Sequence, residues 1–143
     1  MTAVDAKVQL LGEASRAASE ALQYIHMRDI AELRALRTPP EGAKSSMILV
    51  TVLLGGEATW DAAKATVLMD KDFVQTLSGL NLSAISDEAI ETAGTMLQRP
   101  ELDHSMIRKV STCCSNMCSW ARAVHCHGVT HRELVALQGV TSP

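Results

Sequence analysis

Apolar residues recur at alternating intervals of four and three residues along the first part of the chain. They fall at Val4, Val8, Leu11, Ala18, Leu22 and Ile25, with the small residue Ser15 between Leu11 and Ala18. This heptad spacing draws one stripe along a helix, which is typical of a coiled coil and also of an amphipathic helix in a bundle. The stripe then steps five residues to Ile30 and resumes at Leu33, which indicates a change of phase. We therefore expect one long helix over residues 2–37.

Turn signals follow this helix and divide the middle of the chain into shorter helices. Pro39 and Pro40 end the first helix, because proline disfavours helical geometry in the residue before it. Capping residues and glycines then bound further apolar stretches. The helices expected from these signals cover residues 41–54, 59–69, 70–79, 86–97 and 103–127. Gly128 is interpreted as a break, after which Thr130 and Glu133 form a capping box for a last segment.

This order of elements predicts an all-α fold, a small helical head on an antiparallel two-helix coiled-coil stub. The outgoing stalk helix is expected over residues 1–37, the head over 38–124 and the returning stalk helix over 125–143. Aromatic residues make up only 3% of the chain, so the core must be aliphatic, which suits helix packing better than a sheet.

Charge and hydropathy exclude several classes of protein. The formal net charge of -3 excludes a globally basic nucleic-acid binder. No apolar run approaches the roughly 18–20 residues that span a bilayer, and the first residues lack the layout of a signal peptide. The sequence therefore predicts neither a nucleic-acid nor a membrane partner.

Candidate chemistry is sparse. The chain has no phosphate-binding glycine loop followed by lysine and no motif that joins Ser, His and Asp into a triad, so no catalytic residue is assigned. The cluster Cys113, Cys114, Cys118, His125, Cys126 and His127 invites a zinc site. One straight helix cannot wrap four tetrahedral ligands, so we interpret the cysteines as reduced, metal-free packing residues of a cytosolic protein. No cofactor is expected.

Positive charge gathers in one stretch of this acidic chain. Residues 99–132 carry five basic side chains against two acidic ones: Arg99, Arg108, Lys109, Arg122 and Arg132 against Glu101 and Asp103. A local positive patch suits an acidic partner surface, whereas charge counting alone favours a solvated helix face.

Several short motifs, taken in order, resemble one family. They are Arg28-Asp29-Ile30 through Glu32-Leu33 to Pro39-Pro40, Leu53-Leu54-Gly55 with Thr59-Trp60, Asp72-Phe73 with Ile85-Ser86-Asp87, Arg99-Pro100-Glu101, Lys109-Val110-Ser111 and Cys118-Ser119-Trp120-Ala121-Arg122-Ala123. Together they span about residues 20–125 and resemble the microtubule-binding stalk tip of dynein heavy chains, the axonemal type more than the cytoplasmic.

The resemblance implies a non-catalytic binding segment of a motor whose ATPase lies elsewhere in the heavy chain. Its partners would be tubulin in the microtubule and the rest of the heavy chain, in the cytoskeleton and, for an axonemal type, in the cilium. Lys44 matches a family lysine at the tubulin interface, and Lys109, Arg108, Arg122 and Ser105 complete the expected microtubule-binding set. Register control of microtubule affinity is assigned to Ile25, Ile30 and Leu33.

Two other interpretations stay open on the residues alone. A structural or adaptor helical bundle that oligomerises through its coiled coil has the same periodicity, and a thiol- or metal-handling helical protein has the same cysteines. Microtubule co-pelleting separates the first interpretation from these two, and zinc titration addresses the last.

Overall fold

The computed structural model describes residues 2–139, and these residues form helices and turns without a strand. The α-helices are α1 (Ala3–Leu22), α2 (Met27–Ala35), α3 (Glu41–Leu53), α4 (Trp60–Ala63), α5 (Phe73–Ser78), α6 (Asp87–Met96), α7 (His104–Val110) and α8 (Thr112–Gly139). A π-helical turn, η1 (Lys64–Leu68), and two 3-10 turns, η2 (Leu82–Ala84) and η3 (Pro100–Leu102), lie between them. The expected all-α class is confirmed.

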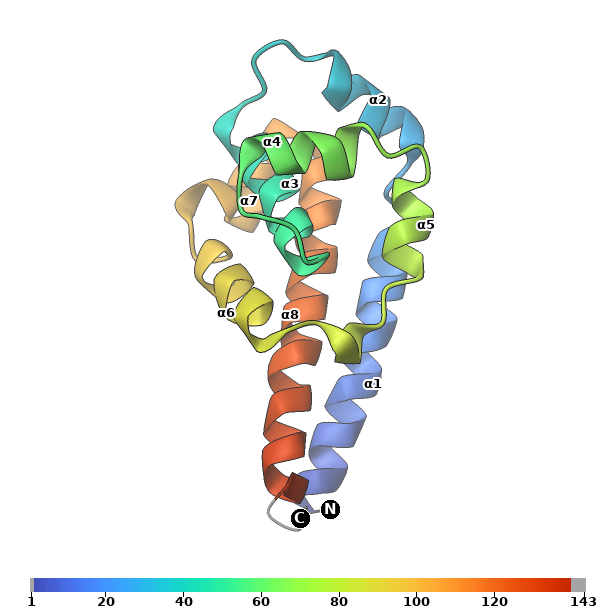
Figure 1. The fold of residues 1–143 in the computed structure, drawn as a ribbon, viewed down its shortest axis with the longest axis vertical. Coiled ribbons are helices and arrows are strands. Elements are labelled where there is room, and N and C mark those ends of the chain that lie inside the picture. Colours follow the sequence, from blue (N-terminus) through green and yellow to red (C-terminus); the bar gives the residue numbers. More distant parts are fainter. Residues whose placement is uncertain (1, 140–143) are drawn as a thin grey trace.

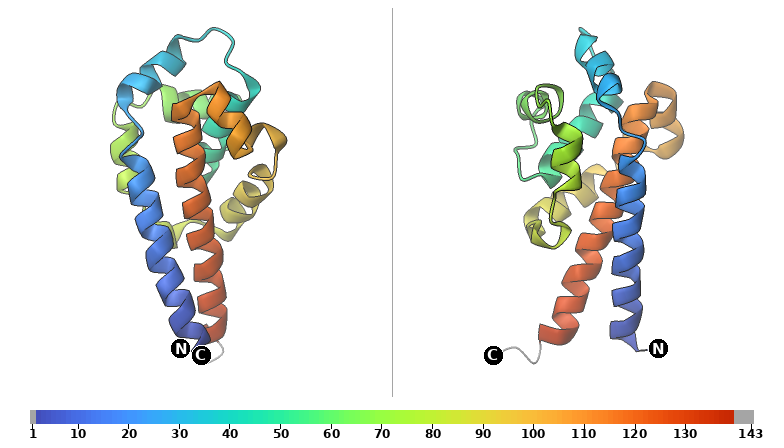
Figure 2. Two further views of the ribbon diagram at one scale, coloured as in Figure 1. Left: turned by 180° about the vertical axis from the view of Figure 1, so that it is seen from behind. Right: turned by 90° about the vertical axis from the view of Figure 1, so that its right-hand side faces the viewer.

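The long helices α1 and α8 run antiparallel and form what we call the stalk pair, from whose upper part the short helices build a head (Figures 1 and 2). A capping box between Thr2 and Asp5 begins α1. Lys7 Nζ lies 3.4 Å from Glu133 Oε2 near the lower end of the pair. Asn116 Nδ2 donates to the carbonyl of Tyr24 at 3.1 Å near the upper end. These two contacts mark the alignment of α1 and its following turn with α8, and Ala14 and Ala18 of α1 are buried between them.

The face that α1 turns inward differs in part from the predicted stripe. Val8 is 52% exposed and Ser15 is exposed, whereas Ala14 is buried. The half-buried Lys7 takes the place expected for Val8 and pairs with Glu133. The predicted stripe was therefore wrong at Val8 and Ser15, because a stripe from Val4 through Lys7, Leu11 and Ala14 to Ala18 keeps a heptad spacing just as the predicted one does.

The expected single helix over residues 2–37 was also wrong, since residues 23–26 separate α1 from α2. A step of five residues turns about 140° away from a helix face at about 100° per residue, so Ile30 could not follow Ile25 inward on a straight helix. The break resolves this conflict. Ile25, Ile30 and Leu33 are all buried and belong to the core of the head.

The head packs around α3, whose residues Met47, Leu49, Val50 and Leu53 are almost fully buried. Gly55 follows α3 with φ of 91°, a left-handed conformation that favours glycine and ends the helix. Thr59 and Ser86 cap α4 and α6 with their hydroxyl oxygens, as expected. In η1 the amide of Met69 donates to the carbonyl of Lys64, so one wide turn lengthens α4.

The end of the chain corrects two further expectations. The helix predicted over residues 103–127 is divided at Ser111, whose extended backbone separates α7 from α8 and whose hydroxyl accepts from the Cys114 amide at 3.1 Å. Gly128, in contrast, does not break α8, which runs on to Gly139. The expected boundary between head and returning stalk near residue 125 therefore lies inside a continuous helix.

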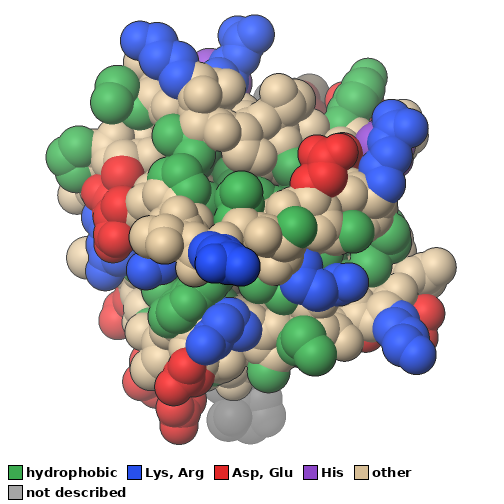
Figure 3. Space-filling view, turned by 90° about the horizontal axis from the view of Figure 1, so that it is seen from above, with side chains coloured by type: hydrophobic (Ala, Val, Ile, Leu, Met, Phe, Trp, Pro, Cys, Tyr) green, Lys and Arg blue, Asp and Glu red, His purple; other side chains and the backbone are tan. Residues whose placement is uncertain are grey.

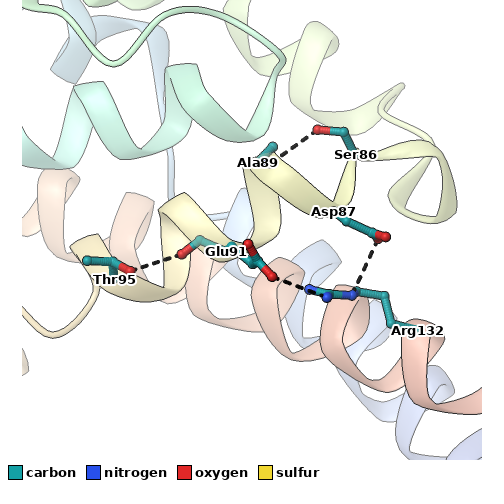
Figure 4. Close-up of polar contacts among 6 residues, drawn as sticks. All are labelled: Ser86, Asp87, Ala89, Glu91, Thr95 and Arg132. Carbon is teal, nitrogen blue, oxygen red and sulfur yellow. Dashed lines mark hydrogen bonds and ion pairs between the residues drawn. The ribbon is translucent and has the colours of Figure 1, made fainter.

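Gly128 has a packing role instead. A Cβ built on Gly128 would lie 2.7 Å from Ile90 Cγ1 on α6, and one built on Gly94 of α6 would lie 2.6 Å from His125 Nε2 on α8. The two glycines thus let α6 and α8 approach closely. Arg132 of α8 adds ion pairs to Asp87 and Glu91 of α6, each at 3.4 Å (Figure 4). Small residues and paired charges together hold α6 on the stalk pair.

Candidate functional site

The predicted basic residues come from two elements of the head that are joined by direct contacts. Lys44 lies in the first turns of α3, and Arg108 and Lys109 lie in α7. Ser45 Oγ donates to Glu101 Oε2 of η3 at 2.9 Å. Gly42 lies against the segment before α7, because a Cβ there would be 3.2 Å from the carbonyl oxygen of Glu101. The start of α3 is therefore fixed relative to η3 and α7.

The short helix α7 presents most of the site. Asp103 begins it by accepting from the Ser105 amide and hydroxyl, and these hydrogen bonds lower the pKa of the Asp103 carboxyl. Arg108 and Lys109 are exposed, and together with His104 and Ser105 they line a shallow hollow. The predicted residues Ser105, Arg108 and Lys109 thus share one surface.

Arg122 has a different position from the other predicted residues. It lies on α8, and its Nη2 donates to the Leu102 carbonyl at 2.8 Å. This bond ties η3 to α8, just as Ser45 ties η3 to α3. Arg122 therefore supports the segment that leads into α7. We call Lys44, Ser105, Arg108 and Lys109, with Arg122 beside them, the cationic surface.

Sequence analysis missed the apolar part of this surface. Met106 is 51% exposed and Val110 is 41% exposed, both on α7 beside the basic residues. Within α7 only Ile107 is buried, so the remaining side chains of this short helix are free to meet a partner. The sequence carries no signal for this exposure, because Met106, Ile107 and Val110 lie within about 100° of one another on a helix and fit an ordinary buried stripe.

Lysine and arginine side chains predominate over acidic ones on the end of the molecule far from the two termini (Figure 3). Green hydrophobic side chains lie between them. Positive potential on one end of a protein with a net charge of -3 favours an acidic partner and speeds its association.

Comparison with known proteins decides the family. The sequence profile described as the microtubule-binding stalk of dynein motor matches residues 4–130, which is most of the chain. The chain belongs to the dynein microtubule-binding stalk family. The stalk family supplies the non-catalytic, track-binding segment of the motor.

Relatives and a solved structure agree with this family. The chain is 30% identical over 115 residues to human dynein axonemal heavy chain 2, covering 80% of the chain and 3% of that relative. It is 29% identical over 121 residues to the dynein-1-beta heavy chain of the flagellar inner arm I1 complex of Chlamydomonas reinhardtii, covering 85% of the chain and 3% of the relative. The chain thus spans a small part of the curated dyneins that it matches.

The fold agrees as well. A structure titled "Microtubule Binding Domain of DYNEIN-C" superposes with a TM-score of 0.71 at 22% identity, covering 98% of the chain and 96% of that structure. Among the described residues of this stalk segment, no helix is both long and apolar enough to cross a membrane. No group of three or more His, Cys, Asp or Glu side chains within residues 2–139 is arranged to hold a metal ion.

The cysteines of the stalk segment are free thiols placed on α8. Cys113, Cys114 and Cys118 are buried, and Cys126 is half-buried. Burial raises the pKa of the Cys113 thiol to about 12, with further contributions from Cys114, Asp29 and Glu32. Burial also raises the pKa of Cys114 to about 11. Raised thiol pKa values make these groups poor nucleophiles at neutral pH.

We expect Ellman's reagent at pH 8 to modify Cys126 of the folded protein first, and the three buried thiols only as the protein unfolds. Burial raises the pKa of the Cys113 and Cys114 thiols above the value near 9 that they have in the unfolded chain. Their contribution to the stability of the fold is therefore fully present below pH 9 and is lost as the pH rises to 11–12. The control is protein unfolded in guanidinium, in which all four thiols should react together. Four equal rates in the folded protein would contradict the expected burial.

Proposed function

We propose that the cationic surface binds the acidic surface of tubulin in a microtubule, with Lys44 and Lys109 as its main contacts. The observation that carries this proposal is the packing of the start of α3 against η3 and α7, through the Ser45–Glu101 hydrogen bond and the close approach of Gly42 to Ile107. A charged surface held in a fixed geometry loses little entropy when it meets a partner. Ser105 and Arg108 widen the contact, and Arg122 supports it through the Leu102 carbonyl.

The setting of this interaction follows from the relatives. The curated proteins similar to the chain include axonemal and flagellar dynein heavy chains. We infer that the chain works as part of a dynein heavy chain in the axoneme of a cilium or flagellum, with the microtubule and the rest of the heavy chain as its partners.

Register control forms the second half of the proposal. We propose that sliding of α1 along α8 changes the affinity of the head for its track. Two alternative stripes on α1, one through Val8 and Ser15 and one through Lys7 and Ala14, supply two pairings of the same helix. The turn over residues 23–26 separates α1 from Ile30 and Leu33 in the head core. A shift of α1 therefore acts on the head through Ile25 and this turn.

Charge reversal tests the proposal that Lys44 and Lys109 contact tubulin. Lys109→Glu should weaken microtubule co-pelleting by about tenfold or more, which corresponds to about 1.4 kcal/mol. This exceeds the roughly 0.2–1 kcal/mol of an exposed ion pair, because a repulsion replaces an attraction and part of the contact is desolvated. Lys44→Glu should act in the same direction.

Arg16→Glu provides the matched control. Arg16 is exposed on α1, on the stalk pair and away from the cationic surface, and the substitution changes the net charge by the same amount. It should leave co-pelleting nearly unchanged. Equal curves for the parent, Lys44→Glu and Lys109→Glu would remove both lysines from the site.

A further inference from the structure

The ring of Trp60 lies beneath the ammonium group of Lys44. Lys44 Nζ is 5.7 Å from the centroid of the Trp60 ring, within the range of a cation–π interaction. Both side chains are half-buried. Lys44 forms no ion pair with any described residue, so among these residues the aromatic ring is the group that attracts its charge.

Trp60 is held firmly enough to act as a support. It is the first residue of α4, and the Thr59 hydroxyl fixes the start of that helix by accepting from the Ala62 amide at 3.1 Å. Ala63 in the same short helix is fully buried, and Trp60 itself packs against the core. The ring therefore has one side on the protein interior and offers a surface to Lys44.

Lys44 needs such a support because its side chain is long and flexible. Four rotatable bonds let a free lysine sample many positions, and ordering them on binding costs affinity. The attraction of a ring quadrupole for a cation places few demands on hydrogen-bond geometry, so the ammonium N–H groups that face away from the ring remain free to donate. The arrangement holds the charge without neutralising it.

We propose that Trp60 is a positioning residue of the microtubule-binding surface, which holds the Lys44 ammonium where it meets an acidic group of tubulin. This inference rests on the proposed role of Lys44. Trp60 acts through Lys44 and makes no required contact with the microtubule itself. The two residues therefore form one unit, contributed by α3 and α4.

A double-mutant cycle tests the proposal in the full chain by microtubule co-pelleting. Trp60→Leu keeps an apolar side chain against the core and removes the aromatic face, and it should weaken binding about two- to five-fold, the range of an exposed cation–π contact. Trp60→Phe keeps a weaker aromatic face and should fall between Trp60→Leu and the parent. In a Lys44→Ala background, Trp60→Leu should cause no further loss.

Nuclear magnetic resonance of the side chain reports the contact without microtubules. The Lys44 side-chain methylene protons should be shifted upfield by the ring in the parent, and this shift should vanish in Trp60→Leu. Since this measurement needs only the folded chain, Trp60→Phe serves as the second variant if Trp60→Leu is too unstable.

Three results would overturn the proposal. The first is that Trp60→Leu binds microtubules as tightly as the parent or more tightly. The second is that Trp60→Leu weakens binding equally in the parent and in the Lys44→Ala background. The third is that the Lys44 methylene protons of the parent show no shift from the ring. A Lys44→Ala variant that binds as tightly as the parent would instead remove Lys44 from the proposed site and the Trp60 role with it. Weaker binding of Lys44→Ala, with no effect of Trp60→Leu, would leave the site intact and reject the positioning role alone.

Discussion

Replacing Gly128 with valine should lower the free energy of unfolding by about 3 kcal/mol, and replacing it with alanine should lower it by about 1–2 kcal/mol. A Cβ at this position would lie 2.7 Å from Ile90 Cγ1, far inside van der Waals contact. Ile90 is 1% exposed, so its side chain has little room to move away. The overlap outweighs the gain of up to about 1 kcal/mol that alanine normally brings to a helix interior. Chemical denaturation followed by circular dichroism measures the change.

Gly12 provides the control for the glycine prediction. It lies inside α1, and a Cβ there would meet only the far end of the Arg16 side chain at 3.8 Å. Gly12→Ala should therefore stabilise the protein by about 0.5–1 kcal/mol. A second substitution, Ile90→Val, should recover part of the stability lost in Gly128→Ala. Equal stabilisation by both glycine substitutions would show that α6 and α8 do not meet at Gly128.

Locking the stalk pair in two registers should change microtubule affinity about 5- to 150-fold, the range of typical coupling free energies of roughly 1–3 kcal/mol. A disulfide between Lys7→Cys and Glu133→Cys keeps the pairing seen here, in which the Lys7 side chain reaches Glu133 across the stalk pair. A disulfide between Lys7→Cys and Leu137→Cys holds a pairing displaced by one helical turn. Each locked protein is compared by microtubule co-pelleting, since a bistable element responds only to a difference in affinity between its states.

The same two variants in their reduced forms are the controls, and they should bind alike. Burial of Cys113, Cys114 and Cys118 keeps these thiols out of the oxidation, because their raised pKa values leave little reactive thiolate at neutral pH. Equal affinities of the two oxidised forms would show that the head binds its track independently of α1, and the register half of the proposed function would fall.

Much of the architecture could be predicted because the decisive signals were local. Pro39 and Pro40 mark the end of a helix, and Thr59 and Ser86 act as caps wherever a helix follows them. These signals depend on backbone geometry within a few residues, so they remain valid in any tertiary context. The all-α class and the antiparallel arrangement of the first and last helices followed from them.

The errors came from properties that depend on distant residues. Gly128 was interpreted as a helix break, but Ile90 of α6 needs the space that a side chain there would fill. Whether α1 turns Lys7 and Ala14 or Val8 and Ser15 inward depends on the side chains that α8 presents to it, Glu133 among them. Neither partner can be found from the local sequence, because both lie on other helices.

The candidate site was predicted only in part, for the same reason. The family resemblance pointed to Lys44 and Lys109, which lie far apart in the sequence. The Glu101 carboxylate, which ties η3 to α3 through Ser45, gave no signal because an acidic residue in a turn is common. The apolar residues Met106 and Val110 were missed because exposed hydrophobic side chains can be recognised only when the packing is known.

The central position of α8 has a consequence for how the protein opens. This helix contacts α1, α3, α6, α7 and η2, and its residues from Cys113 to Val124 include most of its buried side chains. Amide protons in this stretch become available to solvent only when several helices separate at once, which requires nearly the full free energy of unfolding. The outlying α2 and α5 have fewer neighbours and can open alone at lower cost. Hydrogen exchange should therefore proceed from the rim of the head towards α8, which makes that helix the last part of the fold to lose its protection.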